Sequence, residues 1–361
     1  MNFQKLYQTV DTFPMTSVLC IGDMMLDEYI SGSVNRLSPE APVPVICRQT
    51  VRQVLGGVGN VAANLTALGC GTHVIYAAAK DAEADTIQQM LVKQNIHAFP
   101  FTAGSVTTKK QRIIAQKQQI CRIDSEEQLN LTKQQEDKII YEVSQLLPRV
   151  NSVLISDYNK GFITPRITQA IIQETNKSGK YILVDPKGSD YTKYKGATLI
   201  KPNLNEFKAA IKQWVPFETS IDSLNPENPQ DLKKLEQLAS LMREQLDIKS
   251  VVVTLGEYGM LASSKGNTFY RPTVAKAVSD VSGAGDTSLA VLGATLTPYA
   301  TVENSLENAL NLANIGAGIV VGKEGTATLS AAELKSTIKT IFNNDASVLW
   351  KNVSTRTQSQ L

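Results

Sequence analysis

A repeating alternation of short apolar segments with helical patterns constrains the fold of this chain more than any other feature. Residues 153–156, 181–185 and 250–254 are typical of buried strands, and residues 165–178 and 232–246 have helical spacing. Parallel strands need a long crossover connection, which a helix of this length supplies. The alternation therefore predicts an α/β fold in which a doubly wound, mostly parallel sheet is sandwiched between helices.

The rest of the chain extends this pattern. We expect further strands at 17–21, 73–79 and 198–201, further helices at 57–68, 85–94, 133–147, 205–214, 285–297, 306–321 and 331–342, and a polar loop at 215–230.

Two early segments break the alternation. Residues 28–48 and 104–124 carry strand patterns with no helix between consecutive strands. We expect them to form a small protruding sheet, the β lid, which covers a site or pairs with a second copy through its edges. Residues 1–345 are then a single domain, and the polar residues 346–361 are a C-terminal tail.

Composition excludes several classes of protein. The formal net charge of +2 provides no basic field for nucleic acid. No apolar run approaches the roughly 18 residues of a membrane helix, and the N-terminus lacks the regions of a signal peptide. We therefore expect a cytoplasmic protein without membrane insertion. The cysteines, Cys20, Cys47, Cys70 and Cys121, form no CxxC pair and are expected to be buried thiols.

Polar residues follow five of the expected strands. In a parallel sheet, ligands bind beyond the carboxyl ends of the strands, so these residues should line one crevice. Lysines and glycine-rich turns suit phosphates, and carboxylates suit sugar hydroxyls or a metal. The residues are Asp23, Asp27, Asp157, Tyr158, Lys160, Asp185, Lys187, Lys201, Asn203, Glu206, Thr254, Gly256 and Gly259.

Two glycine-rich turns precede expected helices. Gly283, Ala284 and Gly285 open one helix, where backbone N–H groups and the helix dipole attract an anion. Asp286 follows directly, and it is either a general base beside the anion or an ordinary helix cap. The other turn contains Gly56 and Gly57, with Asn60 in the first helical turn after it.

The common alternatives to these turns lack their parts. The chain has no GxxxxGK[ST] motif, and GGVGNVAAN at 56–64 does not fit GxGxxG in register, with no strand expected to lead directly into it. HxGH, HExxH and GxSxG are also absent, which argues against adenylyl transfer, zinc proteolysis and serine hydrolysis.

The two turns together resemble a known family. GGVGNVAANLTALG at 56–69 and DVSGAGDTSLAVLG at 280–293 are similar to the paired signatures of the ribokinase-like (PfkB) carbohydrate kinases, and KPNLNEF at 201–207 is similar to a third element. The resemblance covers about residues 17–340. It implies a ribokinase-like fold and an ATP-dependent kinase in which Asp286 is the catalytic base.

The resemblance also implies roles for other residues. The turn at 283–285 would stabilise charge on the transferred phosphoryl group. The sugar would contact Asp27, assisted by Asp23, together with Gly56, Gly57 and Asn60. The nucleotide would contact Thr254, Gly256, Gly259 and Asn314, while Asn203 and Glu206 organise phosphate and Mg²⁺, with Glu206 acting through water. Plainer alternatives stay open, since Asn203 could cap a helix and Asn314 could serve helix packing.

Further segments resemble the branch of this family that acts on heptose 7-phosphates. They are residues 22–46, 107–124, 156–161 and 185–188. Such a substrate carries a distal phosphate that needs its own cations. Residues 109–122 contain Lys109, Lys110, Arg112, Lys117 and Arg122 and no acidic residue, and strand alternation would place Lys110 and Arg112 on one face. Asp185 and the strand-end residues Lys160 and Lys187 complete the candidates, although a charge run is usually a solvated face.

Other functions stay open at this point. A related kinase could act on another sugar or sugar phosphate, and a protein of this fold could bind sugar or nucleotide as a regulator without catalysis. An intact Asp286 with Asn203 and Glu206 favours an enzyme, because a binding protein needs no base beside its phosphate turn. We also expect a homodimer formed through the β lid.

Overall fold

The computed structural model describes residues 3–116, 118–275, 278–297 and 302–343. Within these residues the body is built on a nine-stranded sheet of order β13-β12-β11-β10-β9-β8-β1-β4-β5. The strands from β11 to β5 in this order pair in parallel, whereas β12 and β13 are antiparallel additions at one edge. The strands are β1 (Ser17–Gly22), β4 (Gly71–Ala78), β5 (His97–Thr102), β8 (Ser152–Ser156), β9 (Tyr181–Asp185), β10 (Leu199–Ile200), β11 (Ser250–Thr254), β12 (Met260–Ser264) and β13 (Asn267–Arg271).

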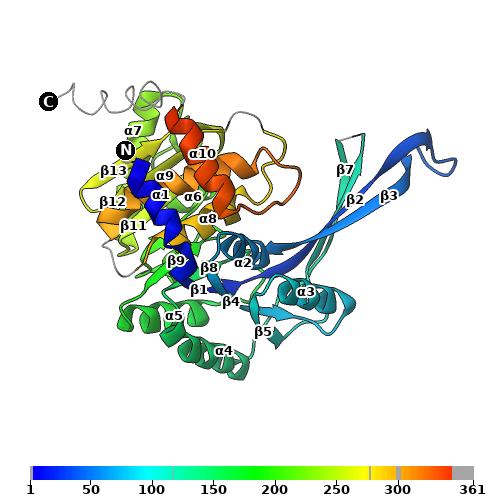
Figure 1. Ribbon diagram of the computed structural model, residues 1–361, viewed down its shortest axis with the longest axis horizontal. Helices are drawn as coiled ribbons and strands as arrows, with labels where there is room; N and C mark the ends of the chain where they lie inside the picture. Colours follow the sequence, from blue (N-terminus) through cyan, green and yellow to red (C-terminus); the bar gives the residue numbers. More distant parts are fainter. Residues whose placement is uncertain (1–2, 117, 276–277, 298–301, 344–361) are drawn as a thin grey trace.

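Helices cover both faces of the sheet (Figure 1). Side chains of β1 alternate between two apolar cores, with Val18 and Cys20 in one and Leu19 and Ile21 in the other. The first core is completed by α1 (Phe3–Asp11), α2 (Val58–Ala67), α3 (Ala82–Lys93), α8 (Ala284–Thr295), α9 (Val302–Val320) and α10 (Ala331–Asn343). The second is completed by α4 (Lys133–Leu146), α5 (Pro165–Lys177), α6 (Leu204–Ile211) and α7 (Pro229–Gln245). The expected α/β sandwich is confirmed.

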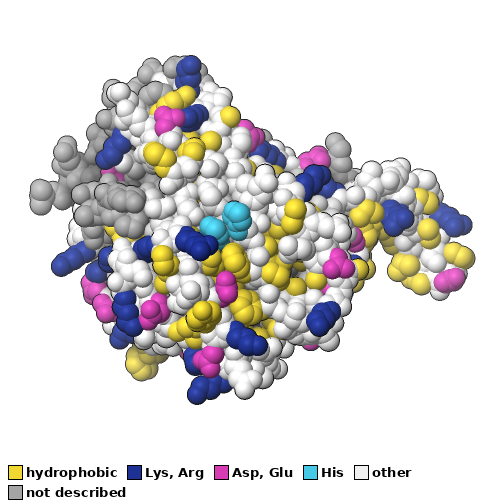
Figure 2. Space-filling view, turned by 60° about the horizontal axis from the view of Figure 1, so that its bottom comes forward, with side chains coloured by type: hydrophobic (Ala, Val, Ile, Leu, Met, Phe, Trp, Pro, Cys, Tyr) yellow, Lys and Arg dark blue, Asp and Glu magenta, His cyan; other side chains and the backbone are white. Residues whose placement is uncertain are grey.

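The β lid is a separate four-stranded sheet of order β3-β2-β6-β7. Its strands are β2 (Met24–Leu37), β3 (Pro44–Gly57), β6 (Lys109–Ala115) and β7 (Gln118–Ser125). The long β2–β3 hairpin extends from the body (Figure 1), and hydrophobic side chains lie on the surface of this projection (Figure 2). Exposed apolar side chains of the hairpin and β7 are Leu37, Val43, Val51, Ile120 and Ile123.

The structure corrects three expectations. First, β3 runs to Gly57 and leads directly into α2, so a strand does feed the first glycine turn. That strand pairs antiparallel within the lid, so the turn still lacks the parallel βαβ context of a dinucleotide site. Second, Cys47 and Cys121 are exposed, because they lie on the two-sided lid rather than in the body. Third, α7 begins at Pro229, within the loop expected at 215–230.

Among the α-helices and strands of the described residues, four were not expected from the sequence. They are α1, β5, β12 and β13, which are short or lie at the edges of the fold. The predicted tail at 346–361 and Lys117 lie outside the described residues. Among the helices that the structure describes, none combines the length and apolar character needed to cross a bilayer.

Candidate active site

A cleft lies at the carboxyl ends of the central strands, as parallel sheets predict. It encloses about 160 Å³ and is lined by residues at or just after the ends of β8, β9, β10 and β11 and at the starts of α6 and α8. Most of its lining residues have a role predicted from the sequence. The lining residues are Asp157, Tyr158, Asp185, Pro186, Lys187, Lys201, Asn203, Glu206, Thr254, Gly283, Gly285 and Asp286.

Asp286 lies in the first turn of α8 with both carboxylate oxygens hydrogen-bonded. Asn60 Nδ2 of α2 donates to Oδ2 (2.8 Å), and the Tyr158 hydroxyl donates to Oδ1 (2.9 Å). The side chain is only 5% exposed. Both donors come from distant parts of the chain, so the carboxylate is held by the tertiary fold rather than as a local helix cap. Each oxygen retains a lone pair that can accept a proton from a bound hydroxyl.

The glycine turn before Asp286 is shaped for the close approach of another group. Gly283 has φ 80°, and a Cβ atom there would lie 2.7 Å from Asn60 Nδ2. The N–H of Ala284 donates to the Val281 carbonyl (3.3 Å), so it points partly away from a ligand. In the part of the chain that the structure describes, the amides of Gly285 and Asp286 have no acceptor. These two amides are therefore available to bind an anion at the start of α8.

Burial raises the pKa of Asp286 to about 7, with a smaller contribution from the Asp185 carboxylate. The hydrogen bonds from Asn60 and Tyr158 act in the opposite direction, because they stabilise the charged form. Burial and the Asp286 charge raise the pKa of Tyr158, so its phenol stays protonated and donates. The resulting carboxylate titrates near neutral pH, which suits a general base.

We expect Tyr158→Phe to move the acid limb of the kcat–pH profile to higher pH. The variant removes a donor to the charged form of Asp286, so the pKa of the carboxyl should rise further. At pH 7 kcat should fall about tenfold, as expected for a hydrogen bond to a charged group. Tyr76→Phe is the control, since the Tyr76 hydroxyl donates to Gln88 outside the cleft. A profile that keeps its wild-type midpoint would contradict this role for Tyr158.

A buried ion pair forms part of the floor of the cleft. Lys201 Nζ, at the end of β10, lies 2.9 Å from Asp185 Oδ2, and the lysine side chain is only 2% exposed. Burial raises the pKa of Asp185, although the Lys201 charge opposes this shift. An added Cβ at Gly285 would lie 3.7 Å from Lys201 Nζ, so the ammonium group is next to the anion turn. Lys201 is therefore placed to neutralise negative charge that develops beside Asp286.

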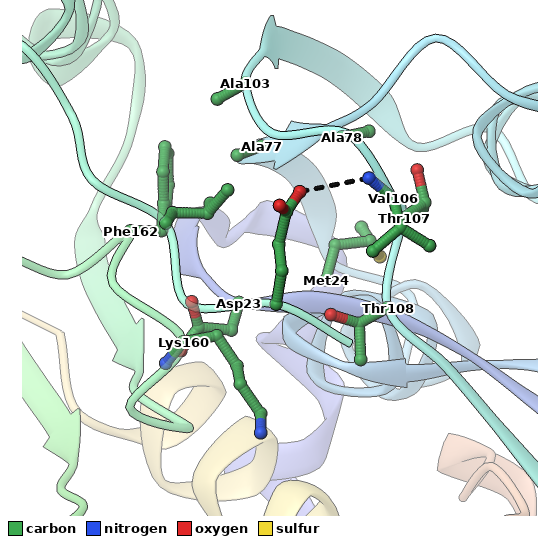
Figure 3. Close-up of a pocket in the computed structure, with 12 residues that line it drawn as sticks. Asp23, Met24, Ala77, Ala78, Ala103, Val106, Thr107, Thr108, Lys160 and Phe162 are labelled. Carbon is green, nitrogen blue, oxygen red and sulfur yellow. Dashed lines mark hydrogen bonds between the residues drawn. The ribbon is translucent and has the colours of Figure 1, made fainter. Parts of the chain in front are cut away.

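Asp23 holds the loop that follows β8. Its Oδ2 accepts the N–H groups of Tyr158 (2.7 Å) and Lys160 (3.2 Å), which fixes the loop that carries Tyr158. Burial, aided by Asp157, raises the pKa of Asp23 to about 6. Asp23 also lines a small cavity of about 20 Å³ beside Lys160, room for about one water molecule (Figure 3). These contacts stabilise the turn that follows β8, and the predicted contact of Asp23 with sugar stays a prediction.

The lid carries the candidate sugar contacts. Asp27 Oδ1 accepts from Arg112 Nη1 at 2.6 Å, so the predicted sugar acceptor is paired with one of the predicted cations. A Cβ atom at Gly56 would collide with the Asp27 carboxylate, which explains why a glycine is needed there. Gly57 has φ 57°, and its Cβ would collide with the Asp23 carbonyl. The glycine pair thus brings the lid strand and α2 close to Asp27.

The other predicted cations lie in three different places. Glu126 bridges Lys110 of β6 (3.4 Å) and Lys160 of the β8–α5 loop (2.6 Å), so the lid and the body meet there. Lys109 points instead to Glu83 of α3 (2.8 Å), as strand alternation predicts. Lys187 lies at the cleft, where it pairs with Glu206 (2.6 Å). The lid–body junction is therefore the place where two predicted cations come together.

Only some of the residues predicted to contact the nucleotide line the cleft. Asn203 caps α6 in a capping box with Glu206, and both residues still line the cleft beside Thr254. The lining of this cavity does not include Gly256 and Gly259 in the β11–β12 turn. Among the described residues, the Asn314 side chain on α9 donates to the Pro272 carbonyl at 2.7 Å. These roles stay predictions.

Tyr158 and Lys201, like Asp157, were expected at strand ends but had no predicted role. Their contacts with Asp286 and Asp185 come from folding, so no local motif signals them. A carboxylate that titrates near neutral pH, beside helix amides and a buried lysine, is suited to moving a phosphoryl group onto a hydroxyl. Fold and site together define the class as a phosphotransferase that acts on an alcohol group.

Comparisons with known proteins place this phosphotransferase among the carbohydrate kinases. Residues 15–333 match the pfkB family carbohydrate kinases, and the chain belongs to this family. It is 39% identical over 319 residues to the bifunctional protein HldE of a Nitratiruptor species, with 88% of the chain covered. It is 36% identical over 333 residues to the bifunctional protein HldE of Pectobacterium atrosepticum, with 92% covered. The chain spans 64% and 65% of the lengths of these two relatives.

Solved structures share the fold at low sequence identity. Phosphofructokinase-2 from Escherichia coli in complex with fructose-6-phosphate superposes with a TM-score of 0.69 at 18% identity, covering 90% of this chain and 98% of that one. Arabidopsis thaliana ribokinase complexed with ribose and ATP gives a TM-score of 0.65 at 17% identity, covering 90% and 99%. These likenesses confirm the predicted ribokinase-like fold.

Proposed function

We propose that this kinase transfers the γ-phosphoryl group of ATP to the C1 hydroxyl of D-glycero-β-D-manno-heptose 7-phosphate. The product is the 1,7-bisphosphate, and the step belongs to ADP-heptose synthesis for lipopolysaccharide core, in the cytoplasm. The observation that carries the catalytic part is the buried Asp286 carboxylate beside the free amides of α8. The sequence segments similar to the heptose 7-phosphate branch support the choice of sugar.

In this mechanism the sugar O1 attacks the γ-phosphorus while Asp286 accepts the O1 proton. The bond between the γ-phosphorus and the bridging oxygen breaks, and ADP leaves with the electron pair. Asn60 and Tyr158 hold the carboxylate in place for this proton transfer. The amides of Gly285 and Asp286, with the Lys201 ammonium, stabilise charge on the equatorial oxygens.

Mg²⁺ fits the donor set of the cleft as an ion that arrives with the nucleotide. No cluster of three or more His, Cys, Asp or Glu suited to hold a metal occurs in the described residues. Mg²⁺ beside phosphates needs only one or two carboxylates, with water completing its shell. Glu206 and Asp185 line the cleft, each paired with a lysine, and would contact the bound ion, Glu206 through water as the family resemblance implies. The ion would neutralise phosphate charge when bound.

We assign the distal phosphate to the junction where Glu126 bridges Lys110 and Lys160. Both lysine side chains are partly buried, 16% and 22% exposed. A phosphate dianion there would replace the Glu126 carboxylate between the two ammonium groups, of which Lys110 also contacts Asp124 at 3.4 Å. Arg112 lies two residues after Lys110 on β6, so both side chains are on the same face of the lid. Arg112 pairs there with Asp27, the predicted sugar contact.

Lys160→Met is expected to raise KM for the sugar 7-phosphate at least about tenfold, with kcat changed much less. The reason is that a distal cation binds the ground state and the transition state equally. Lys109→Met is the matched control, because Lys109 is paired with Glu83 away from the junction. Steady-state kinetics with the 7-phosphate and with the free sugar measure the effect. A KM increase of equal size for the free sugar would rule out the assignment.

A substrate panel tests the proposed function directly. ADP release is measured with ATP·Mg²⁺ and heptose 7-phosphate, free heptose, fructose 6-phosphate or ribose. We expect the highest kcat/KM for the heptose 7-phosphate, with the product phosphorylated at C1. Preference for another sugar would leave a carbohydrate kinase of different specificity. Binding of sugar and nucleotide without turnover would identify a regulator of the same fold.

The proposal includes a homodimer formed through the β lid. The exposed apolar side chains on its strands, among them Val51 and Ile123, favour association with a second lid. Sedimentation equilibrium should give twice the monomer mass, and Ile123→Glu should shift the protein to the monomer. A monomeric wild type at micromolar concentration would remove this part of the proposal.

A further inference from the structure

Tyr29 connects the lid, which carries the candidate sugar contacts, to the body, which carries the phosphoryl turn at 283–285. Its side chain on β2 is 5% exposed, with the Arg52 guanidinium 4.7 Å and the Arg112 guanidinium 5.2 Å from the ring centroid. Both arginines are direct cross-strand neighbours of Tyr29, on β3 and β6. Two cation–π contacts therefore restrict the orientation of the ring.

The Tyr29 hydroxyl binds the segment between α9 and α10. It accepts the Thr326 N–H at 3.0 Å and shares a second hydrogen bond with Thr326 Oγ1 at 2.9 Å. Thr326 is 6% exposed, so the loss of this hydroxyl would leave a buried N–H without its acceptor. Gly325 has φ 64°, and a side chain there would collide with Arg52. The segment is thus closely packed against the lid.

The same segment packs against the phosphoryl turn. A Cβ atom at Gly283 would lie 3.2 Å from Thr326 Cγ2, so the Thr326 methyl group faces the turn. Leu329 N–H donates to Asn64 Oδ1 (3.0 Å), and the same oxygen accepts from the Thr287 hydroxyl of α8 (3.1 Å). The segment is therefore held against the first turn of the helix that carries the catalytic base.

On the lid side, the contacts lead to the candidate sugar site. Arg112, which lies over the Tyr29 ring, donates to Asp27 at 2.6 Å. A sugar hydroxyl that binds Asp27 would compete with Arg112 for this carboxylate. Tyr29 thus touches an arginine whose environment changes with sugar, and a segment that touches the turn where the γ-phosphoryl group is expected.

We infer that the Tyr29–Thr326 contact is a tie that positions the lid and the phosphoryl turn relative to each other. Tyr29 is then a positioning residue. A nucleotide bound at the phosphoryl turn would restrain the motion of the lid strands that contact the sugar. The inference rests on the proposed function, in which the turn receives the γ-phosphoryl group. Coupling between two sites is reciprocal, so a nucleotide bound without sugar is sufficient to reveal the tie.

Hydrogen–deuterium exchange measured with and without the β,γ-imido analogue of ATP and Mg²⁺ tests the inference. In the wild type, the analogue should slow amide exchange in β2 and β6 about fivefold or more. In Tyr29→Phe, which keeps the ring between the two arginines and loses only the hydroxyl, this protection should disappear. Tyr76→Phe removes a hydroxyl at a comparably buried tyrosine that donates to Gln88 and takes no part in the tie, and it should retain the protection.

Two results would overturn the tie: no lid protection in the wild type, or protection that persists in Tyr29→Phe. Thr326→Val provides a second variant, which keeps the N–H and loses only the shared hydroxyl bond, and should give partial protection. Retention of full protection in Thr326→Val and Tyr29→Phe together would place the coupling elsewhere. The measurement uses no sugar, so its outcome is independent of whether the heptose 7-phosphate assignment holds.

Discussion

Asp286→Asn is expected to lower kcat at least about 100-fold, the contribution typical of a general base. Asparagine has nearly the same shape, and its amide can satisfy both neighbours: the Oδ1 atom accepts from Asn60, and the Nδ2 group donates to the Tyr158 hydroxyl. The loss therefore reports on proton acceptance rather than on packing. Steady-state ADP release at pH 8 measures it, with Asp222→Asn on the surface as the control.

The same variant should be at least as stable as the wild type at pH 8. Burial raises the pKa of Asp286 to about 7 from its ordinary value of 3.8, so the folded protein holds this proton more tightly than the unfolded chain. The ionised carboxylate therefore costs stability progressively as pH rises from about 4 to about 7. Asparagine removes that cost, and the difference in melting temperature between the variant and the wild type should shrink near pH 4.

If Asp286→Asn retains more than about a tenth of wild-type kcat, Asp286 is excluded as the general base.

Lys201→Met is expected to lower the free energy of unfolding by about 3 kcal/mol, the usual cost of removing one partner from a buried ion pair. The change would leave the Asp185 carboxylate beside Asp286 without its cation. Asp185 should then take up a proton more readily, so the destabilisation should diminish at acid pH. Urea unfolding at pH 8 and pH 5 measures both effects.

Lys187→Met is the matched control for this prediction. Lys187 also pairs with a carboxylate of the cleft, at 2.6 Å from Glu206, but its side chain is 46% exposed. Exposed ion pairs contribute up to about 1 kcal/mol, so the control should unfold close to the wild type. Equal decreases in the free energy of unfolding for Lys201→Met and Lys187→Met would show that burial does not distinguish the two ion pairs.

Local patterns were sufficient to predict the body of the fold. Strand segments such as 153–156 and 181–185 lie between helices long enough to cross over, and β8 and β9 are parallel neighbours in the sheet. The protruding lid followed from the absence of helices between early strands. The hairpin of β12 and β13 was missed because Met260–Ser264 contains no β-branched or aromatic residue, although β12 is an inner strand paired with both β11 and β13.

The sequence alone determined which polar residues lie at the carboxyl ends of the parallel strands, because each of them directly follows its strand in the chain. It also indicated a base beside an anion turn at Asp286. Only the tertiary structure decided the partners: Asn60 and Tyr158 for Asp286, Lys201 for Asp185, and Thr326 for Tyr29. These contacts join residues far apart in the chain. They depend on how helices and strands pack, and the shift in the pKa of Asp286 depends on burial, which no local pattern encodes.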